Sequence, residues 1–183
     1  MLHETDRLTT RLNHLLNFVR PFDPNFQSID LRKLLARAVH SLHWQIEERN
    51  LNVKISADLK FPGIEADPVL MEEAILIVLS NAIEASSSNG TIECFLEQTT
   101  SQENILIQTI CISDQGEGIP NVNLQRVFEQ FFTTRNRGTG LGLTICKKIV
   151  DLHQGSLEIK SHVDQGTSVY LQFPVAQRNQ EAN

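Results

Sequence analysis

Residues 105–120 read ILIQTICISDQGEGIP, an apolar stretch that runs directly into a loop with two glycines. The apolar and β-branched residues of 105–113 are typical of a strand, so Asp114 is expected at a strand end beside Gly116 and Gly118. Glycine lets a flat ligand approach the backbone closely, and a carboxylate can accept a hydrogen bond from an exocyclic amine such as that of adenine. Taken alone, the same loop is equally compatible with a turn that closes a hairpin.

The rest of the chain supplies elements that would surround this strand. Alternating or apolar runs predict further strands at 51–56, 91–97, 156–160 and 168–173, and helical spacing predicts helices at about 30–50, 68–86 and 140–154. This order predicts an α+β fold. It would be a two-layer sandwich in which helices cover one face of a mixed, mostly antiparallel sheet.

An additional helix is predicted near the start of the chain. Its apolar residues form a one-sided stripe of Leu8, Leu12, Leu15, Leu16 and Val19, a pattern that suits a bundle or coiled-coil partner. The prolines that follow end it, because the residue before a proline avoids the helical region. We therefore expect this helix within residues 1–21, a linker over 22–29, a main domain over 30–174 and a loose polar tail over 175–183.

The chain has 183 residues, a formal net charge of −6 and a pI near 5.5. Such a charge disfavours non-specific binding to nucleic acid or to an anionic membrane surface. No apolar run approaches the ~20 residues that span a bilayer, and the first residues are too polar for a signal peptide. We therefore expect no membrane segment and a cytoplasmic location. Cys94, Cys111 and Cys146 lie in apolar stretches without CxxC spacing and are expected to be small buried hydrophobes.

Asn81 interrupts the apolar pattern of the helix predicted at 68–86, in line with Ile77. A buried amide is normally satisfied inside the fold, so one interpretation is a core asparagine bonded to the backbone. The other interpretation is a ligand for a metal ion or for phosphate oxygens.

A second glycine-rich loop, residues 138–142, leads into the helix predicted at 140–154. Helix N-termini attract anions through unpaired backbone amides and the helix dipole. Thr133, Thr134, Arg135 and Arg137 precede this helix and strengthen the prediction of an anion site. The pattern is neither a Walker loop nor a dinucleotide fingerprint, and glycines at helix starts are also common for structural reasons.

Four motifs, in order along the chain, resemble the N, G1, F and G2 boxes of sensor histidine kinases of two-component systems. They are residues 81–85 (NAIEA), 114–120 (DQGEGIP), 128–134 (FEQFFTT) and 138–143 (GTGLGL). The likeness extends to Gly166-Thr167 and covers roughly residues 30–174. It implies the Bergerat ATP-binding fold, shared with gyrase, a heat-shock chaperone and a mismatch-repair ATPase, and it implies ATP and Mg²⁺ as cofactors.

The resemblance also implies roles for individual residues. Asn81 would coordinate Mg²⁺, and Asp114 would bind the adenine amine. Arg135 and Arg137, in a short lid over the nucleotide, would neutralise phosphate charge and would be the catalytic candidates together with Asn81. The complete set implied to bind the nucleotide is Asn81, Asp114, Gly116, Gly118, Ile119, Thr133, Thr134, Arg135, Gly138, Thr139, Gly140, Leu141, Gly142 and Thr167.

The chain departs from the family pattern in two places. Ile77 stands where the related ATPases carry the glutamate that activates water, which disfavours a hydrolase and favours transfer to a supplied acceptor. The H-box, a histidine followed by an acidic, an aliphatic and a basic residue and then a proline, is absent. His3 and Glu4 match the first two places of this motif. Thr5 then stands at the aliphatic place, Asp6 at the basic place and Leu8 at the proline place. Residues 1–21 instead resemble the second helix of the dimerisation hairpin.

The resemblance therefore implies a catalytic domain that transfers the γ-phosphoryl group of Mg·ATP to a histidine on a dimerisation helix outside this chain. The full kinase would be a homodimer that serves a response regulator, and the isolated chain would not phosphorylate itself. Two other functions stay open. One is a serine kinase of the anti-sigma-factor type on the same fold, and the other is a nucleotide-binding remnant without enzymatic activity.

Overall fold

The computed structural model describes residues 23–57, 62–135 and 138–175. The elements follow one another as β1 (Gln27–Ile29), α2 (Leu31–Ser41), α3 (His43–Glu48), β2 (Asn52–Ala57), β3 (Ile64–Ala66), α4 (Pro68–Ala85), β4 (Thr91–Thr100), β5 (Leu106–Asp114), α5 (Asn121–Leu124), α6 (Gly142–Leu152), β6 (Ser156–His162) and β7 (Gly166–Pro174). The helix predicted around residues 8–19 and the tail beyond residue 175 lie outside the described residues.

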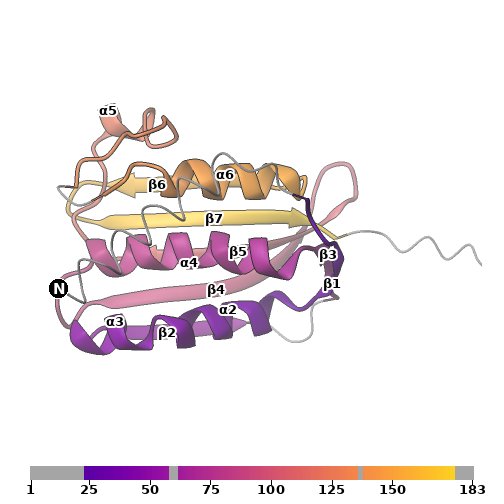
Figure 1. Ribbon diagram of the computed structural model, residues 1–183, viewed down its shortest axis with the longest axis horizontal. Coiled ribbons are helices and arrows are strands. Elements are labelled where there is room, and N and C mark those ends of the chain that lie inside the picture. Colours follow the sequence, from indigo (N-terminus) through magenta and orange to yellow (C-terminus); the bar gives the residue numbers. More distant parts are fainter. Residues whose placement is uncertain (1–22, 58–61, 136–137, 176–183) are drawn as a thin grey trace, which may run out of the picture.

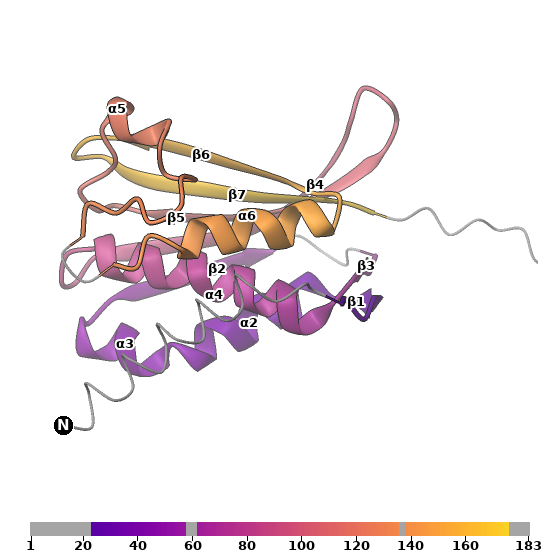
Figure 2. The ribbon, with the colours of Figure 1, turned by 45° about the horizontal axis from the view of Figure 1, so that its top comes forward.

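Five strands form the main sheet, in the order β2-β4-β5-β7-β6. β2 pairs with β4 in parallel, and every other neighbouring pair is antiparallel. The helices α2, α4 and α6 lie side by side over one face of this sheet (Figure 1). In the turned view all three lie on the same side of β6 and β7 (Figure 2). The predicted α+β, two-layer sandwich with a mixed, mostly antiparallel sheet is confirmed.

The core lies between α4 and the sheet. α4 is apolar around much of its circumference because it packs on the sheet on one side and on α2 and α6 on the others. The strands contribute alternate residues, as the pleat requires: in β4, Ile92, Cys94 and Leu96 are buried, while Glu93 and Glu97 are exposed.

Side chains from distant segments fix both ends of α4. At its start, the Asp67 carboxylate accepts hydrogen bonds from Val69 N and Leu70 N, and Asp67 N donates to Nε2 of buried His153 at 3.0 Å. At its end, Nη1 of Arg49 donates to the carbonyl oxygens of Ile83, Glu84 and Ser86 at 3.1–3.3 Å. These bonds satisfy groups that a helix terminus leaves unpaired and hold the last turns of α4 in place.

The structure corrects two predictions about the first part of the domain. The helix predicted at 30–50 is two helices, which meet at Leu42. The apolar spacing continues through Ile46, which is why one helix was predicted. However, α2 buries four residues whereas α3 buries none, so packing against the core does not hold the two as one continuous helix. β1 and β3 were not predicted, because three residues are too few to show a period. β1 falls in the stretch expected to be a linker and pairs with β3.

The three cysteines are buried, as predicted from their apolar surroundings. Burial raises the pKa of each thiol, of Cys94, Cys111 and Cys146, to about 12. They are therefore neutral small side chains of the core. Among the helices in the described part of the chain, none combines the length and the apolar composition needed to cross a membrane.

Candidate functional site

Asp114 is the last residue of β5, at the strand end expected from the sequence, and is only 6% exposed. Its Oδ1 accepts a hydrogen bond from Gly116 N at 2.8 Å and one from Thr167 N at 3.3 Å. Burial raises the pKa of Asp114 above its ordinary value, and the two backbone donors act in the opposite direction. Because both bonds end on Oδ1, Oδ2 is the oxygen that can accept from a ligand.

The loop after Asp114 packs tightly against two other segments. A Cβ atom on Gly116 would lie 2.3 Å from the carbonyl oxygen of Ala85, the last residue of α4. Gly118 has φ +69°, and a Cβ atom there would lie 2.0 Å from the carbonyl oxygen of His162. The protein's own packing therefore requires both glycines, whatever ligand lies beside them.

Ser161, in β6, supports this loop and was not singled out in the sequence. Its buried hydroxyl accepts from Ile119 N at 2.7 Å, donates to Gly166 O at 2.9 Å and lies 2.9 Å from Thr167 Oγ1. It thereby ties the predicted residues Ile119 and Thr167 together. A signal existed: Ser161 continues the alternate positions of Leu157 and Ile159 along β6, where an apolar residue would be expected.

The second glycine-rich loop closes on itself before α6 begins. Gly140, with φ +67°, accepts a hydrogen bond from Phe131 N at 2.9 Å, and a Cβ atom on it would lie 2.3 Å from the Phe131 carbonyl carbon. Thr139 Oγ1 accepts from Leu141 N at 3.3 Å, Leu141 is buried, and Gly138 N donates to Arg135 O at 3.2 Å. The start of α6 has no side-chain cap among the described residues, so its first backbone amides can bind an anion.

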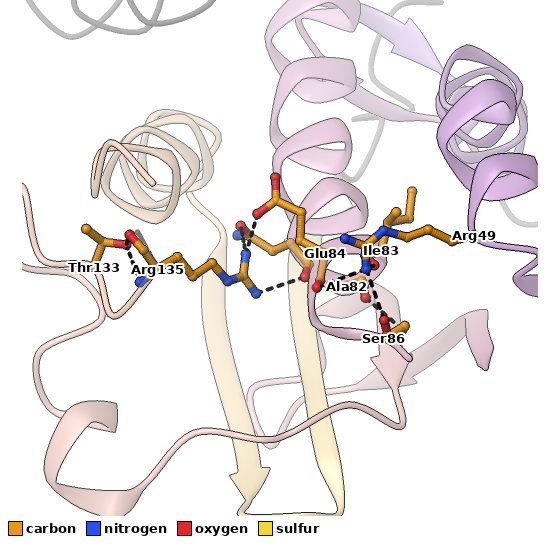
Figure 3. A network of polar contacts seen from close by, with 8 residues as sticks. Arg49, Ala82, Ile83, Glu84, Ser86, Thr133 and Arg135 are labelled. Atoms are coloured by element: carbon orange, nitrogen blue, oxygen red, sulfur yellow. Dashed lines mark hydrogen bonds and ion pairs between the residues drawn. The ribbon is translucent and has the colours of Figure 1, made fainter. Parts of the chain in front are cut away.

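Arg135 reaches from this loop to the last turns of α4 (Figure 3). Its Nη1 donates to Asn81 Oδ1 at 3.3 Å and to Glu84 Oε2 at 2.8 Å, and its Nη2 donates to Asn81 O at 3.1 Å. Thr133 and Thr134 are both exposed, and Thr133 Oγ1 accepts from Arg135 N at 3.1 Å. Arg137 lies outside the described residues, and Glu84 was not singled out in the sequence.

Asn81 is half-buried, and its amide oxygen is bonded to an arginine side chain rather than to the backbone. No cluster of three or more His, Cys, Asp or Glu side chains that could hold a metal occurs in residues 23–57, 62–135 and 138–175. An amide oxygen is nevertheless a hard ligand of the kind that Mg²⁺ accepts when phosphates and waters supply the others. The donor set therefore fits a cation that arrives with a phosphorylated ligand.

The two glycine-rich loops meet α4 at places that differ by two turns. Gly116 lies against Ala85, and a Cβ atom on Gly142 would lie 3.3 Å from the side chain of Ile77. Asn81 is midway between these contacts. At 1.5 Å per residue, the eight residues from Ile77 to Ala85 span about 12 Å. Ile77 is 8% exposed and brings no carboxylate to the end near α6.

This arrangement offers a buried acceptor at one end and helix amides with an arginine at the other. It suits an elongated ligand with an amine-bearing base and an anionic tail, and so places the protein in the class of nucleotide-binding domains. Residues 66–177 match the family of histidine kinase-, DNA gyrase B- and HSP90-like ATPases, and the chain belongs to this family.

Named relatives agree with this membership. The chain is 31% identical, over 96% of its length, to sensor histidine kinase ZraS of Escherichia coli (strain K12), of which it spans 37%. It is 33% identical, over 94% of its length, to the alginate biosynthesis sensor protein KinB of Pseudomonas aeruginosa, of which it spans 29%. The chain therefore spans about a third of the length of these curated relatives.

Solved structures give the same result for the fold. The nucleotide-free catalytic domain of histidine kinase ThkA superposes with a TM-score of 0.73 at 27% identity, and the match covers 82% of this chain and 96% of that one. A mycobacterial sensor histidine kinase, MprB, has a TM-score of 0.70 at 26% identity, with 82% and 98% of the two chains covered. The domain is thus an ATP-binding catalytic domain of the histidine kinase type.

Proposed function

We propose that this domain serves a two-component sensor histidine kinase and transfers the γ-phosphoryl group of Mg·ATP to a histidine on a dimerisation helix outside this chain. The observation that carries the proposal is Asp114, a buried carboxylate with its second oxygen available, two turns of α4 away from an anion-binding helix start. A base that donates from its amine and a chain of phosphates match these two ends.

At the base end, Asp114 Oδ2 accepts from the adenine amine, and the neighbouring backbone supplies a flat surface. Gly116 and Gly118 let the loop pack closely on Ala85 and His162, and Thr167, held by Ser161, completes the surface. Ile119 is positioned by the same serine. Guanine carries a carbonyl oxygen where adenine carries the amine, so a carboxylate at this place favours adenine nucleotides.

At the phosphate end, Thr139, Gly140, Leu141 and Gly142 shape the turn that presents the first amides of α6. Arg135 is tied to this loop through Thr133 and Gly138. We assign it to the developing phosphate charge. Arg137 and Thr134 are assigned to the same lid from the sequence pattern.

Mg²⁺ would be held by Asn81 together with phosphate oxygens, and when bound it neutralises charge on the transferred group. The chain's own contribution is to orient the nucleotide and to exclude a hydrolytic base. Ile77 fills the place where a carboxylate would activate water, so transfer to a positioned acceptor is the favoured reaction.

None of the described histidines, His40, His43, His153 and His162, begins an H-box motif. His153 is buried, with Nε2 bonded to Asp67 N and Nδ1 2.7 Å from Ile149 O. His43 pairs with Glu47 at 3.1 Å, and His40 stacks on His43. We therefore place the acceptor on a helix of a partner. Residues 1–21 would be the second helix of the dimerisation hairpin, and the connection to the domain would end at β1. A cytoplasmic homodimer that passes phosphate to a response regulator completes the proposal.

Incubation of the chain with labelled ATP and histidine-containing hairpins tests the reaction. We expect acid-labile phosphate on the hairpin histidine, none on a hairpin in which that histidine is glutamine, and none with Asp114→Asn at low ATP. Acid-stable phosphate on a serine of a partner would instead identify a serine kinase. Nucleotide binding without transfer to any hairpin of the panel would favour the non-enzymatic alternative.

A further inference from the structure

One contact near the phosphate end has a role that the motifs do not assign. We propose that Glu84 is a positioning residue that sets the Mg²⁺ dependence of nucleotide binding, because it holds Arg135 on the amide oxygen of Asn81, where the cation must bind. This inference rests on the function proposed above, in particular on Asn81 as the Mg²⁺ ligand.

A single guanidinium group engages both residues. Nη1 of Arg135 lies 3.3 Å from Asn81 Oδ1 and 2.8 Å from Glu84 Oε2, and Nη2 lies 3.1 Å from Asn81 O. Asn81 and Glu84 are three residues apart and therefore neighbours on one face of α4. Figure 3 shows the arginine side chain extended between its loop and this face of the helix. The carboxylate supplies the shortest of the three contacts.

The arginine contact and a bound cation exclude each other at Asn81. A Mg²⁺ ligand oxygen lies about 2.0–2.1 Å from the ion, so a cation on Oδ1 would stand only a few ångströms from Nη1. Two positive charges at that separation repel strongly in a partly buried site. Arg135 must therefore leave Asn81 before or while the cation binds, and it then becomes available to phosphate oxygens.

Glu84 decides how readily Arg135 leaves, because it attracts the guanidinium without being a ligand of the cation in the proposed site. The side chains of Arg135 and Glu84 are 31% and 53% exposed, so water and salt weaken their attraction. We expect the effect on the Mg²⁺ requirement to be about two- to fivefold, the scale of an exposed ion pair. Such a contact restrains the arginine but yields to nucleotide.

The decisive variant is Glu84→Gln, which keeps the shape of the side chain and removes its charge. Glu72→Gln is a matched control on the same helix, because Glu72 pairs with Arg37 at 3.0 Å and lies nine residues before Asn81. The measurement is the free Mg²⁺ concentration at half-maximal binding of a fluorescent ATP analogue. We expect Glu84→Gln to lower this midpoint about two- to fivefold and Glu72→Gln to leave it unchanged.

A second background separates the proposed role from simple repulsion between Glu84 and phosphates. In Arg135→Gln there is no arginine to hold, so adding Glu84→Gln should no longer shift the midpoint. A shift that persists in this background would overturn the proposal in favour of direct repulsion. An unchanged midpoint in Glu84→Gln itself, with ATP still bound, would overturn it as well. If the unaltered chain binds no adenine nucleotide at saturating Mg²⁺, the proposed function fails and this inference fails with it.

Discussion

Replacing Asp114 by asparagine tests the base end of the site most directly. The side-chain oxygen of asparagine can still accept from Gly116 N and Thr167 N, as Oδ1 of Asp114 does at 2.8 and 3.3 Å. The amide nitrogen then takes the place of Oδ2 and presents N–H donors to the adenine amine, which is itself a donor. The substitution therefore replaces a hydrogen-bond acceptor with a donor at one atom and keeps the bonds from Gly116 N and Thr167 N in place.

The size of the effect follows from the burial of this group. Asp114 is 6% exposed, and disturbing a buried hydrogen bond to a charged group costs about 1–3 kcal/mol. At about 1.4 kcal/mol per factor of ten, ATP affinity should fall about 5- to 150-fold. GTP should lose less or gain, because its base presents a carbonyl oxygen to the new N–H donors. The ratio of ATP to GTP affinity is therefore the more specific measurement.

Titration calorimetry with ATP and GTP provides both numbers, and circular dichroism checks that the fold persists. Asp151→Asn is a suitable control, since it makes the same chemical change at an exposed ion pair with Lys147 on α6. Equal ATP affinity in Asp114→Asn and the unaltered chain would refute the assignment of the carboxylate to the base. An unchanged preference for ATP over GTP would refute the reasoning about donors.

Four further outcomes are expected. Asn81→Ala should erase the Mg²⁺ dependence of nucleotide binding and Asn81→Asp should retain it, which titrations with and without EDTA would measure. Burial raises the folded-state pKa of Asp114. The stability that this group contributes is therefore fully present below its unfolded pKa of about 3.9 and is lost as pH rises through the folded pKa. In urea unfolding from pH 3 to 7, the free energy of unfolding of Asp114→Asn should increase relative to that of the unaltered chain as pH rises. Ser161→Ala should lower the free energy of unfolding by about 1–3 kcal/mol, because it leaves buried partners unpaired, and the same denaturation curves test this. With pKa values of about 12, the thiols of Cys94, Cys111 and Cys146 should resist iodoacetamide at pH 8 while the chain is folded and react in urea, as mass spectrometry would count.

The elements that could be predicted are those whose pattern is local. The apolar and β-branched residues of 105–113 predicted the strand that the structure places at Leu106–Asp114, and with it the place of Asp114 at a strand end. The long apolar pattern of α4 was equally visible. The break at Leu42 was not, because the apolar spacing of α2 continues into α3 and only the missing burial of α3 distinguishes the two.

The parts of the site that were missed depend on contacts between distant segments. Ser161 acts on Ile119, 42 residues earlier, and Glu84 acts on Arg135, 51 residues later. Periodicity within one segment carries no information on such pairs, although the polar residue in the apolar register of β6 was a usable sign for Ser161. No sequence signal marked Glu84 as the acceptor for Arg135, since an exposed glutamate near a helix end is ordinary.

The two ends of the site place opposite demands on the ligand-free domain. At the base end, a carboxylate is buried with a raised pKa, and both backbone donors bond its Oδ1, so Oδ2 can accept from an adenine amine while those two bonds stay in place. At the phosphate end, Arg135 already has three acceptors, so phosphate and Mg²⁺ must replace contacts that exist. Asp67 and Arg49 hold the two ends of α4, so we expect the side chains to exchange partners while the helix stays in place. Binding should therefore gain most of its free energy at the base, and ADP and ATP should differ in affinity by less than the added charge alone would suggest.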